Sequence, residues 1–288
     1  MDTGQTAGDH YTSLQGFYER LTRHLAIRIP LWLPGTSTLE EAMMHAHTYM
    51  AQAAKPAKGQ YILDAGCGLG STAFWLAREF EARVLGVSNS ASNIDRCLAL
   101  AKERDLRHLT DFRVADLMTS EFPEETFDSV WNLESLNYLC PKQHYVQKAF
   151  GMLRPGGTWV CMDRYSDVRG CDDGRNQAAE AVLTTGLYTP QHWVDAGGLQ
   201  AYMRQAGFID VSYLDLTEYA VASRAQRRRG GSGAAPALLT SVWRPSSFRA
   251  LLRARRVIRA SFDLMERGLM TYGLLSGSKP PKPASLQS

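Results

Sequence analysis

Three glycines alternate with single residues directly after a short apolar stretch. Gly66, Gly68 and Gly70 form this pattern. The stretch before them, Tyr61–Leu63, ends in Asp64. Because glycine has no Cβ, the backbone can turn tightly at such positions and approach a ligand closely. Dinucleotide-binding proteins share the Gly-x-Gly spacing, so the spacing alone does not identify the ligand.

The acidic residues around this turn help to identify the ligand. In a nicotinamide-dependent enzyme an acidic residue usually ends the second strand, where it binds the ribose. This chain has Ser88 and Asn89 there, whereas Asp116 ends the third predicted strand. A carboxylate at that point can accept a hydrogen bond from an adenine amino group. With Asp64 entering the turn, the pattern favours S-adenosylmethionine (SAM), and a purely structural turn is the alternative.

A carboxylate follows the fourth predicted strand, where the reactive group of a cofactor would be presented. The segment reads Trp131-Asn132-Leu133-Glu134-Ser135-Leu136-Asn137-Tyr138. Glu134 could act as a general base or stabilise a positive charge in a desolvated pocket. The alternative interpretation is a glutamate that caps the next helix or supports the site from outside it.

Strands that alternate with helices must position these residues. Apolar runs predict strands at 61–64, 83–87, 111–116, 127–132, 158–162, 208–216 and 269–275. Helical spacing predicts helices at 71–81, 92–104, 142–153 and 199–206. This order predicts an α/β fold, with a doubly wound, mostly parallel, Rossmann-like sheet of seven strands. Ligands of such sheets bind beyond the carboxyl ends of the strands.

Three regions follow from the changes in pattern along the chain. Residues 1–56 predict an N-terminal helical cap. Residues 57–223 predict the cofactor-binding core, with a polar and aromatic insertion at 164–200 that serves as a helical lid over the substrate. Residues 224–288 predict a basic linker, lid helices and the last strand.

The composition excludes several classes of protein. The chain has 288 residues and a formal net charge of +3, too small a charge to indicate nucleic acid as a partner. Arginines crowd the region between Arg224 and Arg259, which could serve an anionic substrate, a membrane surface or simply a solvated face. No apolar run is long enough to span a membrane, so we expect no stable membrane insertion.

The cysteines indicate a reducing compartment. There are five of them, with no CxxC pair, so neither a disulfide framework nor a zinc site is indicated. The N-terminus lacks a basic start followed by an apolar run, so no signal peptide is expected. We therefore expect a cytoplasmic protein without a metal bound by its own side chains.

Four segments resemble the ordered motifs of class I SAM-dependent methyltransferases: Leu63–Gly70, Val84–Asn93, Val114–Asp116 and Leu153–Gly157. The second is similar to a segment of the branch that holds sterol, tocopherol and cyclopropane-forming enzymes, with Asn93 where glutamine is usual. The resemblance implies that SAM is the cofactor. The residues expected to bind it are Asp64, Gly66, Cys67, Gly68, Gly70, Ser88, Asn89, Asn93, Asp116, Leu117 and Leu133.

Other segments resemble the prenyl-diphosphate C-methyltransferases. Asn132–Tyr138 is similar to their Asn-Glu-Ser-x-x-Tyr segment, Tyr213–Thr217 to their Asp-x-Thr, and Gly268–Leu275 to their Tyr-Gly-x-x closing strand. One departure is Ile29–Trp32, where many relatives carry His-x-Gly-Tyr-Trp. The resemblance implies methylation of a carbon in an isoprenoid such as isopentenyl or geranyl diphosphate, with Glu134 and Tyr138 as the catalytic residues.

A substrate of this kind needs aromatic faces for a carbocation and arginines for a diphosphate, with Mg²⁺ as a candidate second cofactor. The substrate-binding candidates are Tyr18, Trp32, Tyr165, Arg164, Tyr188, Trp193 and Arg244. For each aromatic residue, packing in the core is the alternative interpretation.

Two other functions stay open at this point. An O- or N-methyltransferase of another small natural product would need a base, for which His144 or His192 could serve. A nucleic-acid methyltransferase would use the arginine-rich region. Against it, Asn132-Leu133-Glu134-Ser135 stands where an Asn-Pro-Pro-Tyr type motif would be expected. We therefore expect a small-molecule partner and no nucleic acid, with a homo-oligomer as a candidate assembly.

Overall fold

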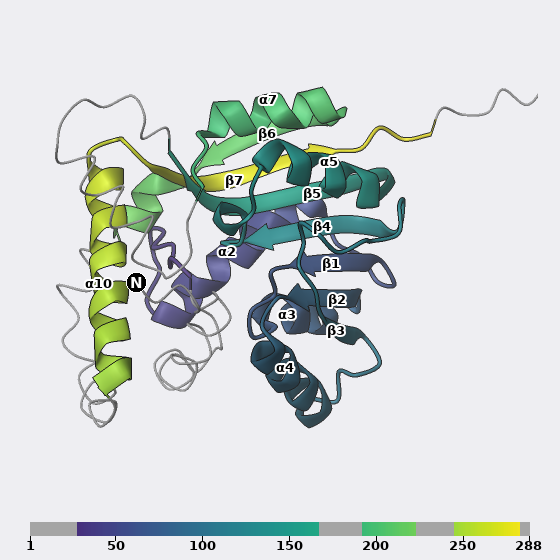
Figure 1. Cartoon of the computed structure of the whole chain (residues 1–288), viewed down its shortest axis with the longest axis horizontal. Coiled ribbons are helices and arrows are strands. Elements are labelled where there is room, and N and C mark those ends of the chain that lie inside the picture. Colours follow the sequence, from purple (N-terminus) through teal and green to yellow (C-terminus); the bar gives the residue numbers. More distant parts are fainter. Residues whose placement is uncertain (1–27, 167–191, 223–244, 283–288) are drawn as a thin grey trace, which may run out of the picture.

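The structure is a computed structural model that describes residues 28–166, 192–222 and 245–282. Its centre is a sheet of seven strands in the order β3-β2-β1-β4-β5-β7-β6 (Figure 1). The strands are β1 (Tyr61–Ala65), β2 (Arg83–Ser88), β3 (Thr110–Val114), β4 (Phe127–Leu133), β5 (Leu153–Tyr165), β6 (Ile209–Asp215) and β7 (Thr271–Ser278). Only β7 runs antiparallel to its neighbours, so the predicted seven-stranded, mostly parallel Rossmann-like sheet is confirmed.

Helices cover both faces of this sheet. They are α2 (Leu39–Ala54), α3 (Ser71–Phe80), α4 (Ala91–Glu103), α5 (Lys142–Met152), α7 (Ala196–Ala206) and α10 (Pro245–Glu266), with the short 3-10 helix η1 (Leu136–Tyr138). Successive residues of a strand point to opposite faces. Accordingly, Ile62 belongs to a core cluster with residues of α2, α3, α4 and α10, whereas Leu63 belongs to a second cluster with residues of α5 and α7.

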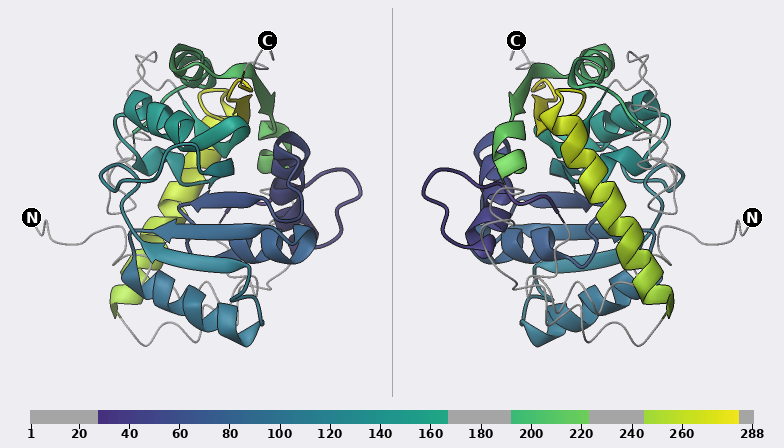
Figure 2. Two further views of the ribbon diagram at one scale, coloured as in Figure 1. Left: turned by 90° about the vertical axis from the view of Figure 1, so that its right-hand side faces the viewer. Right: turned by 90° about the vertical axis from the view of Figure 1, so that its left-hand side faces the viewer.

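The long helix α10 lies on the side of the molecule where β4 ends (Figure 1). Figure 2 shows it running diagonally across that side of the sheet. Since β4 runs parallel to β1, the turn after β1 opens toward the same side. Within the described residues, no helix is long and apolar enough to cross a membrane.

Strand pairing moves some of the predicted boundaries. β5 is longer than the predicted 158–162 because Leu153 pairs with Phe127 and Tyr165 pairs with Thr271. β7 extends past residue 275 to Ser278, which pairs with both Thr158 and Ile209. Backbone N–H and C=O groups that form hydrogen bonds with a neighbouring strand belong to the sheet, even where the local amino-acid composition does not predict a strand.

The predicted insertion at 164–200 is also shorter at both ends. Residues 164–165 complete β5, and residues 196–200 begin α7. The Asp195 side chain caps this helix by accepting a hydrogen bond from the backbone N–H of Gly198 at 2.8 Å. Most of the insertion, the linker and the first part of the N-terminal cap lie outside the described residues.

Candidate active site

The glycine turn after β1 has the conformation that its spacing predicts. Gly66, Gly68 and Gly70 all have positive φ, at 89°, 54° and 78°. A Cβ on Gly66 would lie 2.4 Å from the Cβ of Ser135, so the turn packs directly against the segment after β4. A Cβ on Gly68 would meet nothing within 4 Å. Gly68 therefore borders open space, and a side chain there would project into it.

That space is a pocket at the carboxyl ends of the strands, and it brings together ten of the eleven residues predicted to bind the cofactor. They are Asp64, Gly66, Cys67, Gly68, Ser88, Asn89, Asn93, Asp116, Leu117 and Leu133. Glu134 and Tyr138, the two predicted catalytic residues, line the same pocket.

Gly70 is the exception, and its structural role differs from the predicted one. It is the N-cap residue of α3, and it does not line the pocket. A Cβ there would come within 2.9 Å of the Phe74 ring and 3.1 Å of Cys97 Sγ. The glycine is therefore needed for close packing of α3 and α4 rather than for ligand contact.

The two carboxylates expected to bind the cofactor lie at opposite ends of the pocket. Asp64 lies near the end of β1 and Asp116 follows β3. Because β2 separates these strands, their axes are about 10 Å apart, and Asp116 lies four residues past Phe112, which is level with Asp64. Asp64 is buried and accepts a hydrogen bond from Ala73 N at 3.1 Å. Asp116 is exposed and accepts one from Met118 N at 2.7 Å. An elongated ligand with a polar group at each end matches this arrangement.

Burial changes the charge state of the Asp64 end. Desolvation raises the pKa of Asp64 to about 7, although the hydrogen bond from Ala73 and the charge of Arg28 oppose this shift. Desolvation likewise lowers the pKa of Arg28 to about 10, so its guanidinium remains charged at neutral pH. This end of the pocket thus holds a cation beside a carboxylate that loses its proton near neutral pH.

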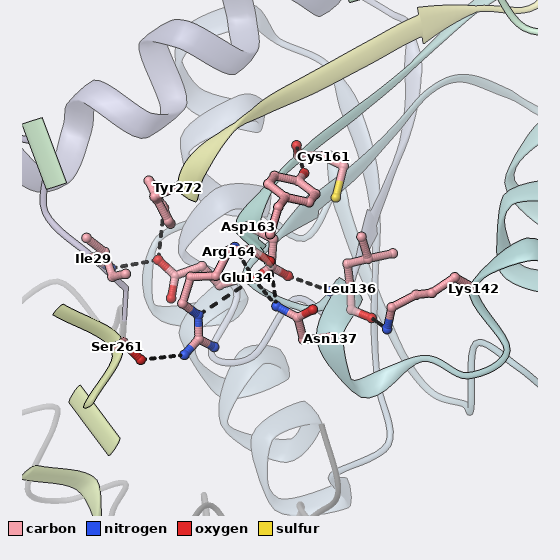
Figure 3. Close-up of polar contacts among 11 residues, drawn as sticks. Ile29, Glu134, Leu136, Asn137, Lys142, Cys161, Asp163, Arg164, Ser261 and Tyr272 are labelled. Carbon is pink, nitrogen blue, oxygen red and sulfur yellow. Dashed lines mark hydrogen bonds and ion pairs between the residues drawn. The ribbon is translucent and has the colours of Figure 1, made fainter. Parts of the chain in front are cut away.

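Glu134 follows β4 directly and is held in an unusual conformation. Its φ is 54°, a left-handed value that is uncommon for a residue other than glycine. Its Oε1 accepts hydrogen bonds from Ile29 N at 2.6 Å and from the Tyr272 hydroxyl at 2.9 Å (Figure 3). Strained residues of this kind persist only where their surroundings fix them, and they concentrate at functional sites.

Burial shifts the pKa of Glu134 in one direction, and a nearby cation and hydrogen bonds shift it in the other. Desolvation raises its pKa, whereas the charge of Arg164 and the hydrogen bond from Ile29 N lower it. A carboxylate with a raised pKa is a stronger base than an exposed one. Glu134 therefore combines the position and the basicity that a proton acceptor beside a cofactor needs.

A second buried carboxylate fixes the segment that carries Tyr138. Asp163, on β5, accepts hydrogen bonds from Leu136 N at 2.9 Å and from Asn137 Nδ2 at 2.8 Å (Figure 3). The ammonium group of Lys142 donates to the carbonyl oxygens of Leu136 and Leu139, at 2.7 and 2.6 Å. These contacts hold η1 at the rim of the pocket.

Asn132 and Ser135 tie this segment to the glycine turn. Ser135 Oγ donates to the carbonyl oxygen of Ala65 at 2.6 Å, and Asn132 Nδ2 donates to the same oxygen at 3.1 Å. Asn132 Oδ1 accepts from the Tyr145 hydroxyl at 2.8 Å and from Trp159 Nε1 at 2.9 Å. The buried amide is thus fully used, and it fixes the end of β4 relative to the end of β1.

Sequence reasoning missed three residues of this site. Arg28 lines the pocket, and Ile29 and Tyr272 bind Glu134. Ile29 acts through its backbone, which has no sequence signal. Tyr272 lies in Gly268–Leu275, the segment that resembles the closing strand of the prenyl-diphosphate C-methyltransferases, and this resemblance could have identified it. No motif in the sequence around Arg28 indicates a role in binding.

The described residues among those predicted to bind substrate do not line the pocket. Trp32 is half-buried and donates its backbone N–H to Tyr219 O at 3.0 Å. Arg164 is buried, and its Nη1 lies 3.4 Å from Ser261 Oγ. Its guanidinium carbon lies over the Trp193 ring, 5.4 Å from the ring centroid. The other three, Tyr18, Tyr188 and Arg244, lie outside the described residues.

Tyr165 is a core residue instead of a substrate contact. Its side chain is 1% exposed, and its hydroxyl donates to the carbonyl oxygen of Cys161 at 2.8 Å. It packs edge-on against Tyr213 in the cluster that α5 and α7 cover. The sequence placed Tyr165 in the predicted insertion at 164–200, whereas pairing with Thr271 extends β5 to this residue and buries its side chain.

The pocket fits the cofactor that the sequence led us to expect. Open space borders Gly68, and a buried donor, Arg28 Nε, has no hydrogen-bond acceptor among the described residues. His144 and His192 are exposed, and neither lines the pocket. In the part of the chain that the structure describes, no group of three or more His, Cys, Asp or Glu residues could hold a metal ion.

Comparison with known proteins places these features in a family. Residues 62–157 match a family described as a methyltransferase domain. The chain is 30% identical over 210 residues to erythromycin 3''-O-methyltransferase of Saccharopolyspora erythraea. This alignment covers 71% of this chain and 66% of that protein. It is 31% identical over 188 residues to 27-O-demethylrifamycin SV methyltransferase of Amycolatopsis mediterranei. That alignment covers 65% of this chain and 68% of the relative. The chain thus spans about two thirds of each relative.

A solved structure shares the fold over nearly the whole length. It is a geranyl diphosphate methyltransferase in complex with GPP and sinefungin, with a TM-score of 0.75 and 15% sequence identity. The match covers 96% of this chain and 98% of that chain. At this level of identity the likeness concerns the fold alone.

Replacing Gly68 by valine tests the position of the pocket. We expect Gly68→Val to weaken binding of S-adenosylhomocysteine, the demethylated form of the expected cofactor, by about 10- to 100-fold, because overpacking costs about 1–3 kcal/mol. Gly156→Val is the matched control, since Gly156 also has a positive φ, with open space around it, but lies outside the pocket. Calorimetry would show equal affinities for the two variants if the assignment were wrong.

The pKa of Asp64 predicts a pH dependence. The ionised carboxylate is the form that attracts the ammonium group of S-adenosylhomocysteine, and Asp64 is mostly protonated below its pKa of about 7. Affinity should therefore rise about tenfold between pH 6 and pH 8. Asp64→Asn should abolish this rise and Asp116→Asn should retain it. A titration series that is flat for the unmodified protein would contradict this role.

Proposed function

Since this chain belongs to the SAM-dependent methyltransferases, we propose that it methylates a small molecule, namely a carbon of an isoprenoid such as isopentenyl or geranyl diphosphate. The resemblance to that family noted in the sequence is confirmed by the comparisons. The atom that receives the methyl group is the part that we propose.

One observation supports the proposal: the carboxylate that follows β4 and lines the pocket, Glu134, is buried, and it could take up a proton from substrate. Among the described residues, no histidine or lysine lines the pocket. A hydroxyl or amine acceptor usually relies on such a base. An alkene acceptor instead needs a dry, negatively charged wall while a carbocation exists, and then a base that takes up a proton. Glu134 meets both needs.

When bound, SAM supplies an electrophilic methyl group. The alkene π-bond of the substrate forms the new carbon–carbon bond, the carbon–sulfur bond breaks, and the electron pair stays on sulfur. The neighbouring substrate carbon would become positively charged. A proton on a carbon adjacent to it, such as the carbon just methylated, would then pass to Glu134, and the electron pair of that C–H bond would restore the alkene. The raised pKa of Glu134 favours this uptake. Ile29 and Tyr272 orient the carboxylate by binding Oε1.

The diphosphate part of this proposal rests on the sequence resemblance, because Arg164 does not line the pocket and lies 3.9 Å from Asp163 Oδ1 through its Nε. Arg164 adds a buried positive charge close to Glu134. A diphosphate would bring Mg²⁺ with it through its own oxygens, which are the ligands that this ion prefers. We further propose that the enzyme works in the cytoplasm, since Cys67, Cys97, Cys140 and Cys161 are all free thiols.

A second candidate is O-methylation of a natural product. It is favoured by the two relatives whose names describe methyl transfer in erythromycin and rifamycin compounds. In that case Glu134 would have to accept the hydroxyl proton, because His144 and His192 do not line the pocket. The two candidates differ in the bond formed, which mass spectrometry and NMR of the product distinguish.

The test uses labelled SAM with a panel of prenyl diphosphates, followed by phenols and hydroxylated macrolides. We expect a new carbon–carbon bond in a prenyl product. Methylation confined to oxygen or nitrogen would exclude the C-methylation proposal and support the second candidate.

Glu134→Gln separates catalysis from cofactor binding. We expect its affinity for S-adenosylhomocysteine to change by less than about twofold, because the amide still accepts hydrogen bonds from Ile29 N and Tyr272. Turnover should fall on the order of 100- to 10,000-fold, as for the loss of a general base. Near-normal turnover of this variant would remove Glu134 from the mechanism.

A further inference from the structure

Arg28 presents a charged donor that no described residue satisfies. It precedes Ile29, the residue that binds Glu134, and it lines the pocket together with Asp64 and Thr72. Its Nη1 lies 2.8 Å from His47 Nε2. Its Nε is buried and has no hydrogen-bond acceptor among the residues that the structure describes. A buried donor without an acceptor costs about 1–3 kcal/mol, so its persistence indicates a ligand.

His47 orients Arg28 without neutralising it. The ring is buried and stacks on Trp75, with centroids 4.7 Å apart and planes at 8°. Burial and the charge of Arg28 both lower the pKa of His47, so the imidazole is neutral. Its Nε2 therefore accepts the hydrogen bond from the guanidinium. The positive charge of Arg28 stays available to the pocket.

The carboxylates nearest to Arg28 are already engaged elsewhere. Glu134 binds Ile29 N and Tyr272, and Asp64 binds Ala73 N. Within the described part of the chain, Arg28 forms no ion pair with either. One end of the pocket thus offers a fixed cation and a separate fixed anion.

The amino-acid part of SAM is the zwitterion that such a pair complements. Its ammonium group requires an anion and its carboxylate requires a cation with several N–H donors. A guanidinium can bind a carboxylate through two parallel hydrogen bonds, which a lysine or a lone histidine cannot do. We propose that Arg28 binds the α-carboxylate of the cofactor, with Asp64 facing the ammonium group and His47 as the residue that positions Arg28.

This assignment rests on cofactor binding and not on the identity of the methyl acceptor. A ligand-and-variant cycle by calorimetry tests it, with S-adenosylhomocysteine and its decarboxylated analogue as the two ligands and no acceptor substrate present. We expect Arg28→Gln to weaken binding of S-adenosylhomocysteine about 10- to 100-fold, the range for a lost hydrogen bond to a charged group. Binding of the decarboxylated analogue should change by less than about twofold.

Two further variants make the result specific. His47→Phe keeps a ring against Trp75 but removes the acceptor for Arg28, so it should weaken binding of S-adenosylhomocysteine several-fold and leave the decarboxylated analogue unaffected. Arg154→Gln, on the surface beside Asp128, should leave both affinities unchanged.

Two outcomes would overturn the assignment. Equal losses of affinity for both ligands in Arg28→Gln would show that Arg28 supports the pocket as a whole. Unchanged affinity for S-adenosylhomocysteine would show that Arg28 does not contact it. Because no acceptor is used in the cycle, failure of the C-methylation proposal leaves its result intact.

Discussion

The carbonyl oxygen of Val87 accepts hydrogen bonds from two successive backbone N–H groups, those of Gly66 and Cys67, each at 2.9 Å. This double contact bends the chain sharply after β1, and the bend requires glycine because φ at position 66 is 89°. The carbonyl of Ala65, just before the bend, is held by Ser135 from the segment after β4. The pocket and the position of Glu134 both depend on this backbone arrangement.

Glu134 is where three distant parts of the chain meet. It follows β4, receives a backbone hydrogen bond from Ile29 near the N-terminal side, and receives a hydroxyl hydrogen bond from Tyr272 on β7. Arg28 and Ile29 are adjacent, so the residue that we assign to the cofactor and the residue that orients the carboxylate move together. Binding of the cofactor would therefore also fix the segment that holds Glu134, which links cofactor binding to catalysis.

Local sequence patterns were enough to predict much of this molecule. Apolar runs gave the strands, and the positions directly after β1, β2 and β3 gave the pocket residues, because parallel strands place their carboxyl ends together. Arg28, Ile29 and Tyr272 could not be found in this way, since their roles come from contacts between segments far apart in the chain. Tyr165 was predicted in the insertion because its place on β5 depends on pairing with Thr271, more than 100 residues later in the chain.

The bend after β1 is expected to hold an adenosyl cofactor with its sulfur beside Glu134. A crystal structure with S-adenosylhomocysteine measures this most directly. We expect the adenine beside Asp116 and Leu117, the amino-acid part between Asp64 and Arg28, and the sulfur on the side of Glu134. Density for the ligand at any other site, or an empty pocket at saturating ligand, would contradict it.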